Sequence, residues 1–287
     1  MPPPAAGSDW MSPRSASDKS QIPPQPREGF KLSKWYLDCV APDGRAVICY
    51  WASLEWGALS VNWQNASIYE PGKPEVSRSS LRQCPPPVVG GKGITWRVPE
   101  LELHYQAASE TQGFAARLLD TDAGTIDWRV ESPASCVTVT LGPNESIRGS
   151  GYAERMSMTV LPWRVPIDEL RWGRWVSDDG RDSIVWINWK GSLPRTWVFF
   201  NGVQQEGAIV EDDRIGAEGM HLGLARERTL SSTSLMDVLS GIPILARATP
   251  RTFAAMQQTR WCEKVSANSA PGVRRPGHAV HELVIFR

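Results

Sequence analysis

The chain has 287 residues, which is enough for one large domain or two domains of ordinary size. Lys plus Arg and Asp plus Glu number 31 each, so the formal net charge is zero, which argues against a dedicated nucleic-acid-binding protein. The aromatic composition is unusual, because 14 Trp stand beside only 6 Phe and 5 Tyr. We therefore expect either an aromatic-rich core or an aromatic-lined cavity.

The sequence lacks the features of several further classes of protein. No apolar stretch approaches the ~18 residues of a membrane-spanning helix, and the first residues lack the apolar region of a secretory signal. The five Cys are odd in number and show no CxxC spacing, which is typical of free or buried thiols in a reducing compartment. We expect a cytoplasmic protein. No nucleotide-binding, zinc-protease or GxSxG motif is present, so we expect neither cofactor nor metal.

Residues 1–29 form the first predicted segment. Seven of the first 27 residues are Pro, mixed with Ser, Gln and charges, so the segment cannot bury enough apolar surface to offset its ordering entropy. We expect a disordered tail. A partner-binding or targeting arm is the alternative.

From Phe30 onward the sequence predicts β-strands. Apolar, β-branched and aromatic residues recur with period two between turn signals such as Asp178-Asp179-Gly180 and Asn201-Gly202. The clearest predicted strands are Arg45–Trp51, Glu100–Tyr105, Ser135–Leu141, Ser183–Trp189, Thr196–Phe200 and His281–Phe286. Helical pattern is scarce, with single turns expected at Ile167–Trp172 and Leu235–Ser240. Many short strands with little helix predict an all-β sandwich or barrel.

Some predicted strands are apolar on both faces, as in Ser183–Trp189. One face of such a strand packs in a core, and the other must face a second layer or a cavity closed off from water.

The segment Gly149–Val176 carries the densest chemistry and a family resemblance. Its residues Gly151-Tyr152-Ala153-Glu154, then Pro162, then Arg171-Trp172-Gly173-Arg174 resemble the hydroxyneurosporene synthase (carotenoid 1,2-hydratase) family. The wider relatives are the lipocalin-like attachment-protein domain, tocopherol-cyclase-like proteins and two-domain lipocalin-like pericyclases. The hydratases usually have Asp where this chain has Glu154.

Shorter motifs extend the resemblance over roughly residues 30–287. They are Trp35-Tyr36-Leu37-Asp38 with Asp43-Gly44-Arg45, Ile94-Thr95-Trp96, Asp127-Trp128-Arg129-Val130, and His278-Ala279-Val280-His281-Glu282. The resemblance implies two lipocalin-like (calycin-like) antiparallel halves, at 30–160 and 161–287.

The resemblance also implies a reaction. Hydratases and cyclases of isoprenoid chains protonate an unactivated C=C, and water or an internal nucleophile captures the resulting carbocation. The acid must keep its proton near neutral pH, as a desolvated carboxyl group does. Glu154 is the first candidate for that acid and Asp38 the second, with Tyr152 orienting the acid or the water. Candidate substrate-binding residues are Trp35, Trp163, Trp172, Trp175, Trp186, Arg171 and Arg174.

Structural interpretations of the same residues stay open. Glu154 could be one member of an ion pair with Arg155, Arg171 or Arg174, and the Trp residues could be core. Three functions follow: a hydratase or cyclase, a non-catalytic lipocalin-like carrier of a hydrophobic ligand, or a scaffold with filled interiors. We expect a hydrophobic small molecule as partner and no nucleic acid. Peripheral membrane contact stays open, because such substrates reside in bilayers.

Overall fold

The structure is a computed structural model that describes residues 29–91, 93–108, 111–234, 249–250, 253, 255–270 and 273–286. The Pro-rich segment up to residue 28 and the helical turn expected at Leu235–Ser240 lie outside these residues. Within them the regular structure is antiparallel β-strand with two 3-10 helices, which confirms the predicted all-β class.

The first sheet contains ten strands. They are β1 (Phe30–Val40), β2 (Ala46–Trp56), β3 (Leu59–Tyr69), β4 (Val76–Ser80), β5 (Val88–Gly90), β6 (Gly93–Val98), β7 (Leu103–Ala108), β8 (Phe114–Thr121), β9 (Gly124–Leu141) and β10 (Glu145–Met158). Their order across the sheet is β4-β3-β2-β1-β10-β9-β7-β6-β5, and β8 pairs with the first half of β9. The 3-10 helix η1 (Pro99–Leu101) precedes β7.

The second sheet also contains ten strands and follows the 3-10 helix η2 (Pro162–Arg164). They are β11 (Glu169–Ser177), β12 (Ser183–Lys190), β13 (Arg195–Phe200), β14 (Val203–Gln204), β15 (Ile209–Val210), β16 (Arg214–Ala217), β17 (Met220–Gly223), β18 (Thr229–Ser234), β19 (Gln257–Ala270) and β20 (Val273–Ile285). Their order is β14-β13-β12-β11-β20-β19-β17-β16-β15, with β18 on β19. The proposed division of the chain at residues 160 and 161 falls in the connection between the sheets.

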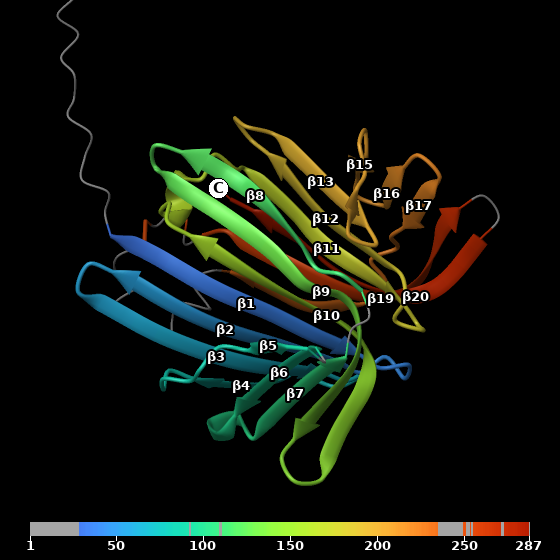
Figure 1. Cartoon of the computed structure of the whole chain (residues 1–287), viewed down its shortest axis with the longest axis horizontal. Coiled ribbons are helices and arrows are strands. Elements are labelled where there is room, and N and C mark those ends of the chain that lie inside the picture. Colours follow the sequence, from blue (N-terminus) through green and yellow to red (C-terminus); the bar gives the residue numbers. More distant parts are fainter. Residues whose placement is uncertain are drawn as a thin grey trace, which may run out of the picture.

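The two sheets have the same topology. Adding ten to each strand number of the first sheet gives the strand order of the second, including the extra strand on the ninth. The chain is therefore a structural duplication, although no tandem repeat is visible in the sequence. In Figure 1 the blue-to-green strands of the first sheet lie beside the yellow-to-red strands of the second.

Strand alternation divides the apolar residues among three cores. One core lies within the first sheet and includes Trp35 and Leu37, and one lies within the second sheet and includes Trp175 and Trp186. The third, which we call the intersheet core, contains residues of both sheets, among them Tyr36 and Trp172. Strands that are apolar on both faces thus pack two cores at once.

Strand β12 shows this division clearly. Ile184 and Trp186 point into the core of the second sheet, whereas Val185, Ile187 and Trp189 point into the intersheet core. The period of two that defines a strand delivers successive side chains to opposite faces.

Two local predictions were wrong. The helical turn expected at Ile167–Trp172 is absent, because residues from Glu169 onward join β11 and the amide of Asp168 bonds the Lys190 carbonyl 2.7 Å away. The start of the strand predicted at Glu100–Tyr105 is η1, since Pro99 has a backbone torsion suited to the first position of a helix.

Gly173 on β11 should tolerate no side chain. A Cβ atom there would collide with the indole of Trp186 and would lie 2.6 Å from Cβ of His281. We expect Gly173→Ala to lower the free energy of unfolding by about 1–3 kcal/mol, the usual cost of overpacking, as measured by chemical denaturation. Gly216→Ala is the control, because its nearest neighbour would be 3.4 Å away. Equal stability of the two variants would contradict this packing.

Candidate active site in the intersheet core

Glu154 lies on β10 and points toward the intersheet core, where neutral donors from three strands converge on it. Its Oε2 accepts hydrogen bonds from Tyr152 Oη at 2.6 Å and from Trp128 Nε1 on β9 at 2.6 Å. A third donor, Trp172 Nε1 on β11, lies 3.1 Å away and comes from the second sheet. The site is therefore complete only when both sheets are packed together.

The two oxygens of Glu154 differ in their surroundings. All three donors contact Oε2, and among the described residues Oε1 has no hydrogen-bond partner. Oε1 is not a fully buried atom, so it keeps some accessible surface. A proton held by this carboxyl group would therefore sit on Oε1, the oxygen that accepts none of these hydrogen bonds.

Desolvation raises the pKa of Glu154 above its ordinary value. The hydrogen bonds from Tyr152, Trp128 and Trp172 and the positive charge of Lys34 act in the opposite direction, but burial dominates. No ion pair to Glu154 is present among the described residues within 4 Å; Arg155 pairs with Glu131 instead, and Arg171 with Glu169. The carboxyl group therefore favours its protonated form more than an exposed Glu does.

Asp38, the second candidate acid, is one half of a buried ion pair. Its oxygens accept two hydrogen bonds from Arg174 on β11, at 2.7 Å from Nη2 and 2.9 Å from Nε, and one from Tyr36 Oη at 2.8 Å. Both charged residues are fully buried. Burial opposes the charge of Arg174, yet Asp38 holds the pKa of Arg174 above its usual value. This geometry makes Asp38 the partner of Arg174 in a contact that joins the sheets.

A second carboxylate, Glu282 on β20, lies in a contrasting environment. It accepts hydrogen bonds from Arg260 Nη2 at 2.7 Å and from Gln258 Nε2 at 2.6 Å, and Arg260 also donates to the hydroxyl of Tyr50. Desolvation alone would raise the pKa of Glu282, but Arg260 and Lys34 lower it below the ordinary value.

Glu154 and Glu282 occupy equivalent positions in the duplicated topology. Glu154 pairs with Tyr36 across β10 and β1, and Glu282 pairs with Trp172 across β20 and β11. Neutral donors surround Glu154, whereas a guanidinium binds Glu282. Two carboxyl groups whose environments move their pKa values in opposite directions are typical of an acid and a permanent anion sharing one site.

Aromatic rings form the walls beside Glu154. The ring of Tyr36 lies 4.7 Å from Trp172, and Tyr152 lies 5.9 Å from Trp172, both in edge contacts. On the other side Phe114 stacks on Phe199 with centroids 4.1 Å apart, beside Trp128. These contacts pack aromatic rings on both sides of the acid.

The structure separates the candidate substrate-binding residues. Trp172 and Arg174 lie with Glu154 and Asp38 in the intersheet core. Trp35 faces the core of the first sheet, and Trp175 and Trp186 face that of the second. The cause is parity, since odd and even positions of one strand face opposite sides.

Two further candidates lie near the edge of this region or outside it. Trp163 packs on Trp56 with ring centroids 5.6 Å apart, at the edge of the intersheet core. Arg171 binds Glu169 at 2.7 Å and Asp212 at 2.6 Å, away from Glu154.

Sequence reasoning missed several residues of the site. They are Lys34, Tyr36, Tyr50, Trp128, Arg260 and Glu282. Lys34 and Tyr36 share the parity of Asp38 on β1, and this spacing could have identified them. Arg260 and Glu282 are brought to the site by strand pairing that no local pattern encodes.

The described residues hold neither a candidate metal cluster nor a helix suited to crossing a membrane. No group of three or more His, Cys, Asp or Glu there is arranged to hold a metal ion. No helix in that part of the chain has the length and hydropathy needed to cross a bilayer.

Comparisons with known proteins give similarity of fold. No family model matches the sequence, and no curated protein matches it. The crystal structure of a protein provisionally named AttH from Nitrosomonas europaea aligns over 90% of this chain and 93% of its own, with 10% identity and a TM-score of 0.52. CghA in complex with Sch210972 aligns over 90% and 89%, with 10% identity and a TM-score of 0.55. The fold is thus that of two lipocalin-like halves.

Removing Arg174 should destabilise the protein strongly. Arg174→Met leaves Asp38 buried without its cation, and we expect the free energy of unfolding to fall by about 3–5 kcal/mol. The double variant Asp38→Asn with Arg174→Met should recover part of this loss, because no buried charge remains unpaired. Chemical denaturation of both single variants and the double variant measures the coupling, and strictly additive losses would show that the pair contributes no interaction.

Lys34 should tune the acidity of Glu154. Its ammonium favours the carboxylate, so Lys34→Met is expected to raise the pKa of Glu154 further. A ¹³C NMR titration of the side-chain carboxyls, assigned with Glu154→Gln, measures the shift. Lys31→Met is the matched control, because Lys31 is exposed and pairs with Glu55 at 3.8 Å. A pKa that is unchanged or lowered in Lys34→Met would contradict this role.

Proposed function

We propose that the protein is a lipocalin-like hydratase or cyclase in which Glu154 protonates a C=C of a hydrophobic small molecule. The observation that carries the proposal is the arrangement of donors, which fixes Oε2 and leaves Oε1 free on a desolvated carboxyl group. Sequence motifs around Tyr152 and Trp172 resemble those of carotenoid 1,2-hydratases. The structure of CghA with Sch210972, which has a similar fold, supports a site for a small molecule in this fold.

The first chemical step moves one proton. The π electrons of the substrate C=C form a new C–H bond with the proton on Oε1 as the O–H bond breaks, which leaves a tertiary carbocation and the Glu154 carboxylate. The three donors to Oε2 then stabilise the new negative charge. Tyr152 stays protonated throughout, because burial and Glu154 raise its pKa well above the ordinary value.

The aromatic walls stabilise the cation while Glu282 balances the positive side chains. Rings such as Trp172 and Tyr36 contribute roughly 0.5–2 kcal/mol each as cation–π partners, depending on desolvation. Arg260 and Lys34 would otherwise repel a carbocation, and the Glu282 carboxylate offsets their charge.

Capture of the cation decides between the two reactions. In hydration a water oxygen forms a C–O bond and its proton returns to Glu154, so the product gains one water molecule. In cyclisation an internal C=C or hydroxyl attacks, and the proton lost from the ring system returns to Glu154. We favour hydration of an acyclic isoprenoid or carotenoid, because the motifs Gly151–Glu154 and Arg171–Arg174 resemble those of the hydratases.

Glu154→Gln should abolish turnover with the fold intact. Loss of a general acid typically reduces kcat by 10²–10⁴-fold, and the amide retains the size of the side chain. Mass spectrometry of material extracted from the purified protein identifies the candidate substrate, with acyclic carotenoids and shorter polyprenols as the assay panel. Reaction in H₂¹⁸O distinguishes hydration, which adds labelled oxygen, from cyclisation, which adds none.

The control for this experiment is Glu145→Gln, an exposed carboxyl on the same strand. It should turn over substrate as the unmodified protein does. Full activity in Glu154→Gln would remove Glu154 from the role of acid. Ligand that co-purifies but is never converted by the unmodified protein would favour a carrier.

A further inference from the structure

The described structure contains a cavity of about 560 Å³ whose lining does not include Glu154. Its lining side chains include Ser33, Trp35, Trp51, Arg129, Arg155 and Ser157. The strands β1, β8, β9 and β10 form its floor, and Pro86 of the segment before β5 covers one side.

Strand alternation places this cavity on the opposite face from Glu154. Arg155 pairs with Trp35 across β10 and β1, whereas Glu154 pairs with Tyr36. Lys34, Trp128 and Met156 also line the cavity, but their positions in the strands belong to the face of the intersheet core, so they form part of its floor. One strand, β10, thus separates two sites.

A single cross-strand row supplies the recognition groups. Reading across β9, β10, β1, β2 and β3, register pairs Arg129 with Arg155, Arg155 with Trp35, Trp35 with Trp51, and Trp51 with Gln64. Two guanidiniums therefore adjoin two indoles on one face of the sheet.

The cationic end of the row carries excess positive charge. Arg129 Nε and Arg155 Nε contact the same oxygen of Glu131, at 3.0 and 2.6 Å, and both arginine side chains are 53% exposed. One negative charge is thus shared by two positive charges, which leaves a net positive charge at this end of the row.

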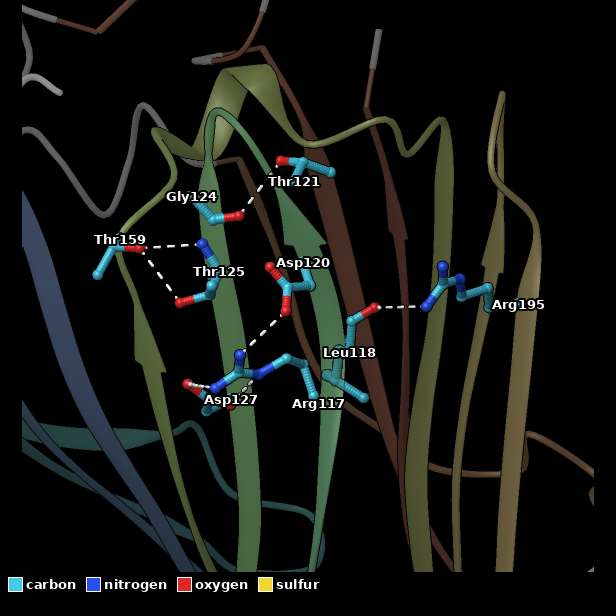
Figure 2. A network of polar contacts seen from close by, with 9 residues as sticks. All are labelled: Arg117, Leu118, Asp120, Thr121, Gly124, Thr125, Asp127, Thr159 and Arg195. Carbon is cyan, nitrogen blue, oxygen red and sulfur yellow. Dashed lines mark hydrogen bonds and ion pairs between the residues drawn. The ribbon is translucent and has the colours of Figure 1, made fainter. Parts of the chain in front are cut away.

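The positive charge of the remaining cavity arginine, Arg117, is balanced by two carboxylates. Figure 2 shows it on β8 between Asp120 and Asp127, at 3.0 and 2.8 Å. Arg195 of the second sheet donates to the Leu118 carbonyl at 3.3 Å and ties the next residue of β8 in place.

The other end of the row carries an unsatisfied amide. Gln64 is 1% exposed, and neither its Oε1 nor its Nε2 has a hydrogen-bond partner. Buried amides are normally paired, because an unpaired one costs free energy. Gln64 does not line the cavity, so this amide makes no contact with its contents.

We propose that this cavity is a second binding site, specific for an amphipathic monoanion. Its carboxylate would bind Arg129 and Arg155, and its apolar body would lie along Trp35, Trp51 and Pro86. The site requires no chemistry at Glu154, so it is independent of the proposed reaction.

Titration calorimetry with decanoate tests the proposal, with decanol and decylamine as neutral and cationic counterparts. Decanoate should bind at least tenfold more tightly than either, because a carboxylate–guanidinium contact is charge-assisted. Equal binding of decanoate and decanol would overturn the anionic specificity.

Two variants locate the site. Arg155→Gln should weaken decanoate binding about tenfold or more, whereas Arg148→Gln, an exposed Arg on β10 outside the cavity, should not. Ser157→Trp should fill the cavity and abolish binding, with Ser60→Trp as the exposed control. Thermal denaturation checks that each variant folds.

Glu154→Gln separates this site from the reaction. It should bind decanoate as the unmodified protein does, even if turnover at Glu154 proves absent. Loss of binding in Glu154→Gln, or full binding in a folded Ser157→Trp variant, would place decanoate in the intersheet core and overturn the proposal.

Discussion

A fully buried carboxylate and a fully buried guanidinium join the two sheets. Asp38 of β1 and Arg174 of β11 make two hydrogen bonds, and Arg174 uses a third nitrogen to bond the His278 carbonyl at 2.7 Å. Because water reaches neither charge, each is stabilised mainly by the other, and removing one would leave the other buried and unpaired. The pair fixes how β11 lies against β1, and the position of Trp172 beside Glu154 follows from that arrangement.

The duplicated topology explains how one site can hold two different carboxyl groups. Equivalent positions of the two halves place Glu154 and Glu282 on the two strands that flank the interface. Different side chains in the neighbouring strands then give the two carboxyl groups different electrostatic environments. On β9 the donor is an indole, which carries no charge, and on β19 it is the guanidinium of Arg260.

Much of the architecture could be predicted from the sequence, because period-two alternation is a local signal. The all-β class followed from it, and so did the need for a second layer on β12. The sequence pattern also placed the candidate acid Glu154 on the same face as Tyr152, two residues away, and the two side chains are hydrogen-bonded. Trp35 and Asp38 are three residues apart, however, so their side chains point to opposite faces of β1.

Other features depended on pairing between distant strands. Trp128 reaches Glu154 because β9 lies beside β10, and Arg260 reaches Glu282 because β19 pairs with β20. The residues adjacent in sequence to Trp128 or Arg260 do not indicate which carboxyl group it contacts. The partner of Arg174 was equally ambiguous, since Asp38 and Glu154 both carry a carboxylate and only the fold selects between them.

The irregular pairing of β9 with β10 has a consequence for insertions and deletions. Register shifts by one residue between Gly151 and Ala153 and by one more between Ala153 and Glu154, so the two shifts together preserve the parity of β9. Loss of a single residue between Glu131 and Ser135 would invert the first half of that strand and turn Trp128 toward the cavity. Length changes compatible with this site must therefore occur there in steps of two.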